Sequence, residues 1–461
     1  TKDVLKKNMT SNGTDGGHSE WLYSAYTGSM GKDEYLSLSL SDALRYEIEK
    51  MTFTDKISGK TVKLENIDDP TEREQIALLL EHLIEKHAKY SNIKLYYTDM
   101  EPGGAADLSE ADLLYDFSHT FAFSGGTAVT GGKITDGRLT EVMLGETPSE
   151  SKTEITAKNI HLTLTGHAAG LMKDAQTGEL THSHIGFDVS AEGLAREKYL
   201  AVRCDVDIDW AGVQSEVQQI FGNYSINGGL VNSVTDGYGD KVDASGNVVK
   251  IDEATLQKNL RSTNKKDGSA NWQIVANTGS LGGEVLRLTD TVTAAAATDE
   301  RLKNAIEKAT YIDPETVSVW QGNGTAVYYN GVYDKNRAEW NTDTLKIQID
   351  GNHLEIVVQN TEQYKVLAKN QNYSVSYTTK LDKNKFIQNG GLATDSYTLL
   401  NTAGLSCGNL NLTASKEGDF TPNVPLEVTK KVENTNGNLT EWTASASTGA
   451  AARTDFVLTD T

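Results

Sequence analysis

The sequence is poor in cysteine and has no long apolar run. Among 461 residues the two cysteines, Cys204 and Cys407, lie far apart, and neither belongs to a Cys-x-x-Cys pair or neighbours a histidine. This spacing excludes a zinc finger and a disulfide framework. We expect two buried thiols, or else one bridge between separate parts of the chain. Since no stretch reaches the roughly eighteen apolar residues of a membrane-spanning helix, we expect no membrane insertion.

Basic residues are also in deficit. The chain has 43 Lys and Arg against 64 Asp and Glu, which gives a formal net charge of −21. An acidic surface repels phosphate backbones, so the composition excludes nucleic acid as an expected partner. Hydrophobic residues make up 38% of the chain and aromatic residues 7%, which is enough to fill real cores. The length predicts two to four domains.

Sequence motifs of catalysis are missing as well. We find no nucleophile elbow, no phosphate-binding loop and no metal triad. A glycan hydrolase would need two facing carboxylates, but acidic residues are too abundant here to single out a pair. His82 and His87 lack the spacing of zinc ligands, and we interpret them as surface or stripe-edge residues of a helix. We therefore expect no enzyme and no cofactor.

Three alternating carboxylates are the remaining metal candidates. Asp205, Asp207 and Asp209 would share one face of a strand, and together they could bind calcium. The alternative is that they form the solvent face of a strand whose Val206 and Ile208 face the core. We favour this second interpretation and expect no bound metal.

One stretch, at about residues 70–90, predicts a helix. Asp69 can cap it and Pro70 fits its first turn. Apolar residues with helical spacing form a single stripe: Ile76, Leu79, Leu80, Leu83, Ile84 and His87. Elsewhere before residue 256, short alternating segments separated by polar turns predict strands. We expect a β-rich region over 1–255, with a possible subdivision near residue 117.

Part of this region has a distinct rhythm of short strands and glycines. The segments AKNIHLTLTGHAAG (157–170) and HIGFDVSAEG (184–193) resemble the repetitive parts of large β-rich bacterial surface proteins. That resemblance implies the stacked turns of a β-solenoid. The alternative is an ordinary β-sandwich.

The second half of the chain contains an internal repeat. Trp272–Thr291 recurs as Trp442–Thr461, with matching Trp, Thr-Gly and LTDT at a constant offset of 170 residues. Short strands joined by turns predict an antiparallel sandwich, with each tryptophan anchoring a core. We expect one complete module at 256–420, then the start of a second, truncated module at 421–461. We also expect the chain to be a piece of a longer array.

The complete module carries three motifs in a fixed order. LTDT (288–291), YIDPETVSVW (311–320) and YTLLNTAGL (397–405) resemble the Ig-like repeats of Gram-positive, cell-wall-anchored adhesins of the collagen-adhesin type. The resemblance implies an Ig-like β-sandwich and an extracellular, cell-surface location. In that family a first-strand lysine is often joined to a last-strand asparagine by an isopeptide bond, which a nearby acid promotes.

Carried onto this chain, the acid is Asp290, the amide is Asn401 and the lysine is Lys258. Burial would make the lysine a neutral nucleophile and keep the acid protonated. Lys430 lies twelve residues before Trp442, and the same distance before Trp272 leads to Leu260, two residues beyond Lys258 on the same strand face. The lysine thus departs from the pattern. The alternative is that the acid and the amide only make turn and edge hydrogen bonds.

These expectations combine into a mainly β, multi-domain surface protein. We expect an adhesin fragment whose region 1–255 binds a host extracellular protein or glycoprotein, such as a matrix protein or an immunoglobulin. The Ig-like modules would form its stalk, and the fragment would be a monomer. The alternative is a purely structural stalk or pilus-like spacer without a ligand of its own.

Overall fold

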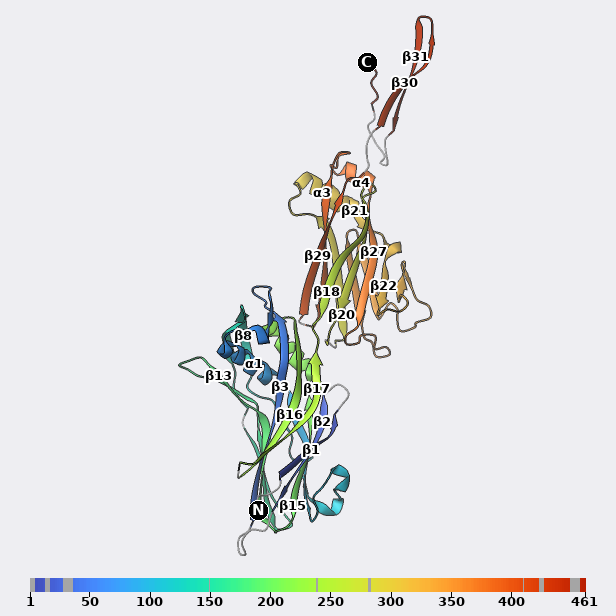
Figure 1. Cartoon of the computed structure of the whole chain (residues 1–461). Coiled ribbons are helices and arrows are strands. Elements are labelled where there is room, and N and C mark those ends of the chain that lie inside the picture. The colour runs from blue at the N-terminus through green and yellow to red at the C-terminus, as the bar shows by residue number, and fades with distance from the viewer. Residues whose placement is uncertain are drawn as a thin grey trace. The chain divides into compact units, whose positions relative to one another are not determined.

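The computed structural model describes residues 5–12, 17–27, 36–148, 150–237, 239–280, 283–408, 410–422, 427–447 and 457–461. With 56% strand and 14% helix, the protein is mainly β, which confirms the expected fold class. The chain divides into two compact units, unit 1 (residues 1–252) and unit 2 (residues 253–461) (Figure 1). In the part of the chain that is described, no helix has the length and apolar character to cross a membrane.

Unit 1 is built on two antiparallel sheets. The first has the order β1 (Leu5–Asn12), β2 (His18–Tyr26), β15 (Tyr199–Ile208), β5 (Ala88–Thr98) and β6 (Leu113–Asp116), with β7 (Phe123–Ser124) paired to β5. The second has the order β10 (Ser151–Ala157), β11 (Ile160–His167), β14 (Ile185–Leu194), β3 (Leu36–Thr54), β16 (Tyr224–Asp236) and β17 (Lys241–Ile251), with β4 (Thr61–Lys63) paired to β3.

Two hairpins and several helices complete unit 1. The hairpins are β8 (Val129–Thr135) with β9 (Arg138–Leu144), and β12 (Gly170–Lys173) with β13 (Leu180–Ser183). The helices are α1 (Pro70–Glu85), α2 (Trp210–Phe221) and the short 3-10 helices η1 (Leu64–Asn66), η2 (Ala105–Asp107) and η3 (Glu110–Asp112). Strands that precede and follow residue 117 lie in the same sheets and share one apolar cluster. The possible subdivision near residue 117 therefore does not divide the core.

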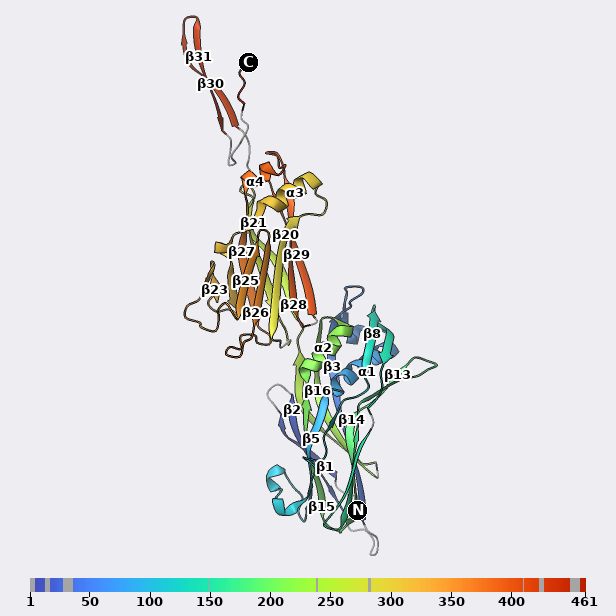
Figure 2. The same ribbon diagram turned by 180° about the vertical axis from the view of Figure 1, so that it is seen from behind.

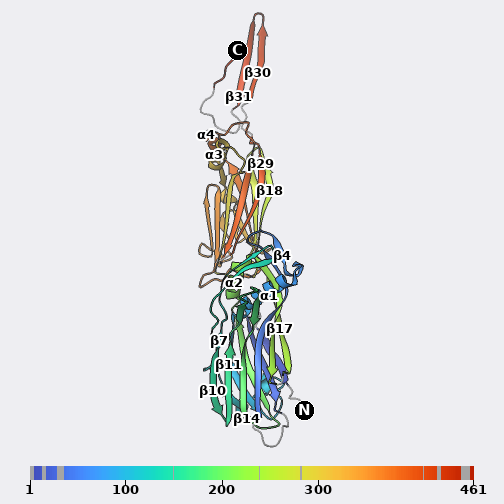
Figure 3. The same cartoon turned by 90° about the vertical axis from the view of Figure 1, so that its left-hand side faces the viewer.

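The segments expected to form a solenoid lie in an ordinary sheet. β11 pairs antiparallel with β14, and β14 pairs antiparallel with β3. Figure 3 shows β10, β11 and β14 side by side. A β-solenoid would stack successive turns in parallel, whereas β14 here pairs with a strand from the beginning of the chain. The β-solenoid alternative is therefore wrong, and the sandwich alternative holds.

Helix α1 confirms the expected helix but is shorter than predicted. Asp69 caps it, since its carboxylate accepts the backbone N–H of Thr71 at 2.9 Å. The helix ends at Glu85, and β5 begins at Ala88. The expected surface position of His82 is wrong, because its ring is fully buried and contacts the carbonyl oxygen of Thr127 at 2.7 Å. The helix packs on β3, β9, β13 and α2, which covers more of its circumference than one apolar stripe indicates.

The contact between β14 and β3 leaves no room for a side chain at Gly186. A Cβ atom built there would lie 1.8 Å from the carbonyl oxygen of Asp42. The carboxylate of Asp42 accepts hydrogen bonds from the Tyr90 hydroxyl at 2.6 Å and from the Asn232 amide at 3.0 Å. The glycine therefore lets two strands approach beside a buried polar network.

We predict that Gly186→Ala destabilises unit 1 by about 1–3 kcal/mol, since a methyl group must displace backbone. Gly104→Ala is the matched control, because Gly104 has open space around it and an extended backbone. The control should change the free energy of unfolding by less than about 0.5 kcal/mol. Denaturant unfolding measures both, and equal stabilities would contradict the close approach.

Unit 2 contains two further antiparallel sheets. The first has the order β18 (Thr255–Asn264), β19 (Ser269–Asn277), β27 (Asn372–Leu381), β22 (Ser318–Gln321), β23 (Tyr328–Tyr329) and β24 (Val332–Tyr333), with β21 (Thr310–Ile312) paired to β27. The second, seen in Figure 2, has the order β25 (Leu345–Asp350), β26 (His353–Gln359), β20 (Val285–Ala294), β28 (Tyr397–Cys407) and β29 (Leu410–Phe420). The helices are α3 (Glu300–Ala309), α4 (Lys383–Gln388) and the 3-10 helix η4 (Pro314–Thr316).

One apolar core fills the space between these sheets. Trp272 is fully buried in it, and its indole nitrogen donates to the hydroxyl of Thr379 at 2.8 Å. The edge strands β18 and β29 lie side by side (Figures 1 and 3). The first and last strands of the complete module are thus neighbours. Cys204 and Cys407 are both buried as thiols, in different units.

The repeat seen in the sequence appears as two hairpins of equal register. Leu260 faces Trp272 across β18 and β19, and a bulge follows it directly. Val432 faces Trp442 across β30 (Glu427–Asn436) and β31 (Leu439–Ser447), and a bulge follows at the same place. The two hairpins differ in their turns, which hold two more residues in the first copy. Trp442 is 55% exposed, in contrast to Trp272.

Candidate functional site

Strand alternation directs the three predicted residues into the core of unit 2. Asp290 lies on the central strand β20, and Asn401 lies on the neighbouring strand β28. Both belong to buried stripes in which every second residue points inward. Lys258 lies on β18 of the opposite sheet, where it is also buried. The three side chains therefore meet between the sheets.

A tyrosine connects the three groups. The Lys258 amine donates to Asp290 Oδ2 at 2.5 Å and to the Tyr377 hydroxyl at 2.5 Å. The same hydroxyl donates to Asp290 Oδ1. It also accepts a hydrogen bond from Asn401 Nδ2 at 2.9 Å. Amine, carboxyl, phenol and amide thus form one contiguous network.

Burial favours the uncharged forms of the amine and the acid. The side chains of Lys258 and Asp290 are both 0% exposed. Burial lowers the pKa of Lys258 to about 8, although the charge of Asp290 opposes this shift. Burial raises the pKa of Asp290, against the opposing effects of Lys258, Tyr377 and Asn401. A proton passing from the amine to the carboxylate would remove two desolvated charges at once.

Only one of the two polar atoms of the Asn401 side-chain amide has a hydrogen-bond partner among the described residues. Its nitrogen donates to Tyr377, but its buried oxygen Oδ1 has no hydrogen-bond partner among the described residues. An unsatisfied buried oxygen is costly, by about 1–3 kcal/mol. It is also the atom that becomes negative when a nucleophile attacks the amide carbon. Asp290 interacts with the Asn401 side chain and, when protonated, could supply a proton to it as this charge develops.

This arrangement has the parts required for amide exchange. The neutral amine of Lys258 would attack Cγ of Asn401, forming a new C–N bond. The bond from Cγ to Nδ2 would then break, and protonated Nδ2 would leave as ammonia. The protonated Asp290 would first give its proton to the amide and then accept the proton that the attacking nitrogen releases, so that the acid is regenerated. Atoms balance without any external reagent.

The alternative of turn and edge hydrogen bonds is wrong. Asp290 and Asn401 lie within β20 and β28, which are both flanked by strands on either side, and both residues are 0% exposed. The equivalence of Lys430 with Leu260 is also wrong. Strand register pairs Lys258 with Ile274, two residues beyond Trp272, and it pairs Lys430 two residues beyond Trp442 in the same way.

The second copy repeats the same local arrangement. The Lys430 amine contacts Asp460, as the Lys258 amine contacts Asp290. Each amine also lies over the ring of its tryptophan, at 5.0 Å for Trp442 and 5.4 Å for Trp272. The lysine, acid and tryptophan therefore belong to the repeat. Counting residues back from tryptophan failed because the two turns differ in length.

Tyr377 was not identified from the sequence. It lies on β27 opposite Trp272, and its ring also contacts the Lys258 amine, 4.7 Å from the ring centre. Burial raises its pKa well above the usual value for a phenol, so the hydroxyl stays protonated. The alternation in Tyr373–Thr378 predicts an inward-facing tyrosine, but it gives no sign of a polar partner.

The three calcium candidates are not gathered into one site. Asp205 is largely buried and accepts a hydrogen bond from Asn92 at 2.7 Å. Asp207 is half exposed and contacts His18 at 2.7 Å. Asp209 lies beyond the end of β15 and caps α2. The alternative interpretation placed Val206 and Ile208 in the core and the aspartates in solvent. Val206 and Ile208 are buried as expected, but Asp205 is also buried.

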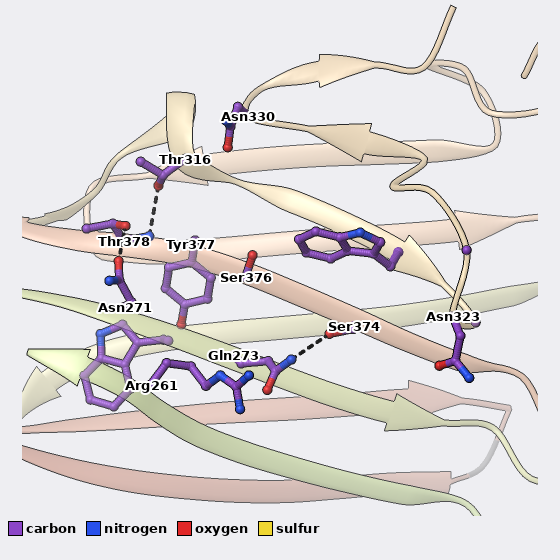
Figure 4. Close-up of a pocket in the computed structure, with 14 residues that line it drawn as sticks. Arg261, Asn271, Gln273, Thr316, Asn323, Asn330, Ser374, Ser376, Tyr377 and Thr378 are labelled. Atoms are coloured by element: carbon purple, nitrogen blue, oxygen red, sulfur yellow. Dashed lines mark hydrogen bonds between the residues drawn. The ribbon is translucent and has the colours of Figure 1, made fainter. Parts of the chain in front are cut away.

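A polar groove lies on the outer face of the first sheet of unit 2 (Figure 4). Its volume is about 760 Å³. It is lined by Arg261 and Trp320 and by outward residues of β19 and β27, including Asn271, Gln273 and Ser374. Gln273 donates to Ser374 at 3.0 Å across these strands. Trp272 and Tyr377 also line the groove, so it borders the strands that carry the buried network.

Solved structures with some likeness to this chain are pilins and adhesins. The pilus backbone of Streptococcus pneumoniae has a TM-score of 0.23 and 12% identity, covering 34% of this chain and 53% of that one. The major pilin subunit of Bacillus cereus has a TM-score of 0.26 and 10% identity, covering 62% and 78%. The N-terminal domain of a Streptococcus gordonii adhesin has a TM-score of 0.23 and 8% identity, covering 88% and 60%.

The match thus spans about half the length of the pneumococcal chain. No protein-family model matches the sequence, and no curated protein sequence matches it. At these identities and TM-scores the likenesses carry no conclusion about function.

We predict that the intact chain weighs about 17 Da less than its sequence mass, because each amide exchange releases one ammonia. Lys258→Ala and Asn401→Ala should each restore the full sequence mass. Lys430→Ala is the matched control, since it removes the corresponding amine of the second copy and should leave the deficit unchanged. Mass spectrometry of the intact variants measures this. A wild-type chain at full sequence mass would contradict the reaction.

Proposed function

We propose that this chain is part of a bacterial cell-surface protein of the pilus or adhesin type, in which unit 2 is a load-bearing stalk module. The observation that supports this proposal is the buried network of Lys258, Asp290, Tyr377 and Asn401. It has the composition and the dry surroundings needed for an internal covalent tie. A stalk module benefits from such a tie, whereas an intracellular catalyst gains nothing from it.

The position of the tie fits a mechanical role. Lys258 lies on the first strand of the module, and Asn401 lies on β28, next to the last strand β29. Tension applied to the ends of the module would enter through β18 and leave through β29. A covalent bond from β18 to β28 would carry that tension across the sandwich. The strands between Lys258 and Asn401 in the chain would then be bypassed, and the pairing of β28 with β29 would be the part of the sheet that still bears the load.

We further propose an extracellular, cell-wall-anchored location for the full-length protein, with unit 1 as its ligand-binding part. This proposal derives from the resemblance of the LTDT, YIDPETVSVW and YTLLNTAGL motifs to adhesin repeats. A host matrix protein, immunoglobulin or other glycoprotein would be the ligand. A stalk or pilus-like spacer without a ligand of its own is the second candidate function, and the network in unit 2 supports it equally.

We predict that loss of the tie makes unit 2 less stable. Asn401→Ala should lower its free energy of unfolding by about 4–5 kcal/mol, the loop-closure value for a crosslink that spans more than a hundred residues. It should also speed cleavage by trypsin. Thr402→Ala, on the same strand but facing outward, is the control and should behave like wild type. Equal stability of both variants would contradict a mechanical role for the tie.

Ligand binding by unit 1 can be tested separately. The full chain and unit 2 alone are immobilised and exposed to matrix proteins, immunoglobulins and serum glycoproteins, with binding followed by surface plasmon resonance. We expect the full chain to bind at least one of them and unit 2 alone to bind none. Binding by unit 2 alone would contradict the division of roles, and binding by neither would leave the spacer as the function.

A further inference from the structure

A carboxylate and two imidazoles converge in unit 1, away from the network of unit 2. Glu85 is the last residue of α1, His182 lies on β13, and His184 follows two residues later. The ligand atoms of the three side chains all lie within 4.8 Å of one another. The spacing His-x-His places both imidazoles on one side of the chain, since alternate residues of an extended strand share a face. Ser183 between them is exposed.

Each group is held by a second contact that fixes its orientation. His182 Nδ1 contacts the carbonyl oxygen of Gly170 at 2.9 Å, so Nδ1 carries the hydrogen and Nε2 turns toward Glu85 Oε2. Glu85 Oε1 accepts the backbone N–H of Tyr46 at 3.0 Å. Imidazole ligands of metal ions usually donate their other nitrogen to a carbonyl or carboxylate in this way. His184 Nδ1 lies 3.0 and 3.1 Å from the two carboxylate oxygens.

The group is almost fully enclosed. The side chains of His182 and Glu85 are each only 1% exposed. Both contacts of His182 are with acceptors, a carbonyl and a carboxylate. A divalent cation between the groups would take Nε2 as a ligand and leave Nδ1 as the donor to Gly170.

A neighbouring histidine packs against the group without belonging to it. His82 lies one helical turn before Glu85 on α1, and its ring makes an edge contact with His182 at 5.1 Å between ring centres. Its Nε2 contacts Thr127, while its buried Nδ1 has no hydrogen-bond partner among the described residues. The C-terminal end of α1 also favours positive charge.

We propose that Glu85, His182 and His184 bind a divalent transition-metal ion of the zinc type. Two imidazole nitrogens and one carboxylate form a donor set that zinc commonly has, with the fourth position left to water or another group. Metal–ligand bonds of about 2.0–2.2 Å place neighbouring ligand atoms roughly 3.3 Å apart in a tetrahedron. The separations of His184 Nδ1 from the carboxylate are close to this value, whereas His182 Nε2 and Glu85 Oε2 are in direct contact and would move apart to admit the ion.

The ion would crosslink separate elements of unit 1. It would fasten the end of α1 to the β12–β13 hairpin and to the start of β14, which follows that hairpin directly in the chain. The side chain of His184 is 36% exposed, which gives the ion a path from solvent. The same fold provides a second group of possible ligands, His18, Glu20 and Asp205, which serves as an internal comparison.

The experiment titrates zinc chloride into the full chain after removal of metals with EDTA, followed by calorimetry. We expect saturable binding that weakens at least tenfold in His184→Ala, roughly the smallest effect seen when a group supporting a metal is lost. His161→Ala, an exposed histidine outside the cluster, and His18→Ala should bind as wild type does. Zinc should also raise the melting temperature of wild type and of both controls, but not that of His184→Ala.

Cobalt(II) provides a second readout that folding alone cannot produce. The visible absorption of a four- or five-coordinate complex should appear in wild type and disappear in His184→Ala. The proposal is overturned if the wild-type chain does not bind zinc, or if His184→Ala binds zinc as tightly as wild type. It is also overturned if binding is lost in His18→Ala instead, which would assign the ion to the other group.

Discussion

The exclusion of water from between two sheets determines the chemistry of unit 2. An amine and a carboxyl group that would be charged in solvent are enclosed there together, and each loses its hydration. Strand alternation supplies the enclosure, because the same inward stripes that hold Trp272 and Tyr377 also hold Lys258, Asp290 and Asn401. The apolar core is therefore what lowers the pKa of Lys258, the condition that the proposed amide exchange requires.

The structural features that the sequence predicted correctly are those that depend on residues close together in the chain. Asp69 before Pro70 and a helical stripe of apolar residues located α1, and period-two alternation indicated a mainly β protein. The motifs of unit 2 selected Asp290 and Asn401, and the face of the first strand selected Lys258; the structure brings the three into one network. In these cases the deciding signal is local: a cap, a period or a short motif.

Features that depend on pairing between distant segments escaped prediction. Nothing near Tyr377 in the sequence indicates that β27 brings its hydroxyl between an amine and an amide. The imidazoles of His182 and His184 meet Glu85 only because α1 packs on β13, about a hundred residues away in the chain. His82 was misjudged for the same reason, since the elements that cover it lie far from it in sequence. The sheet order of unit 1 likewise contains no stacked parallel turns, despite its glycine rhythm.

The two hairpins of unit 2 reach the same register with turns that differ by two residues. In a strand, an insertion of two preserves the direction of every side chain that precedes it, whereas an insertion of one reverses all of them. The two copies thus keep the lysine, the acid and the tryptophan in the same relative positions with turns of different length. An odd insertion within β18 would direct the buried amine of Lys258 into solvent, where it would be an ordinary charged surface lysine.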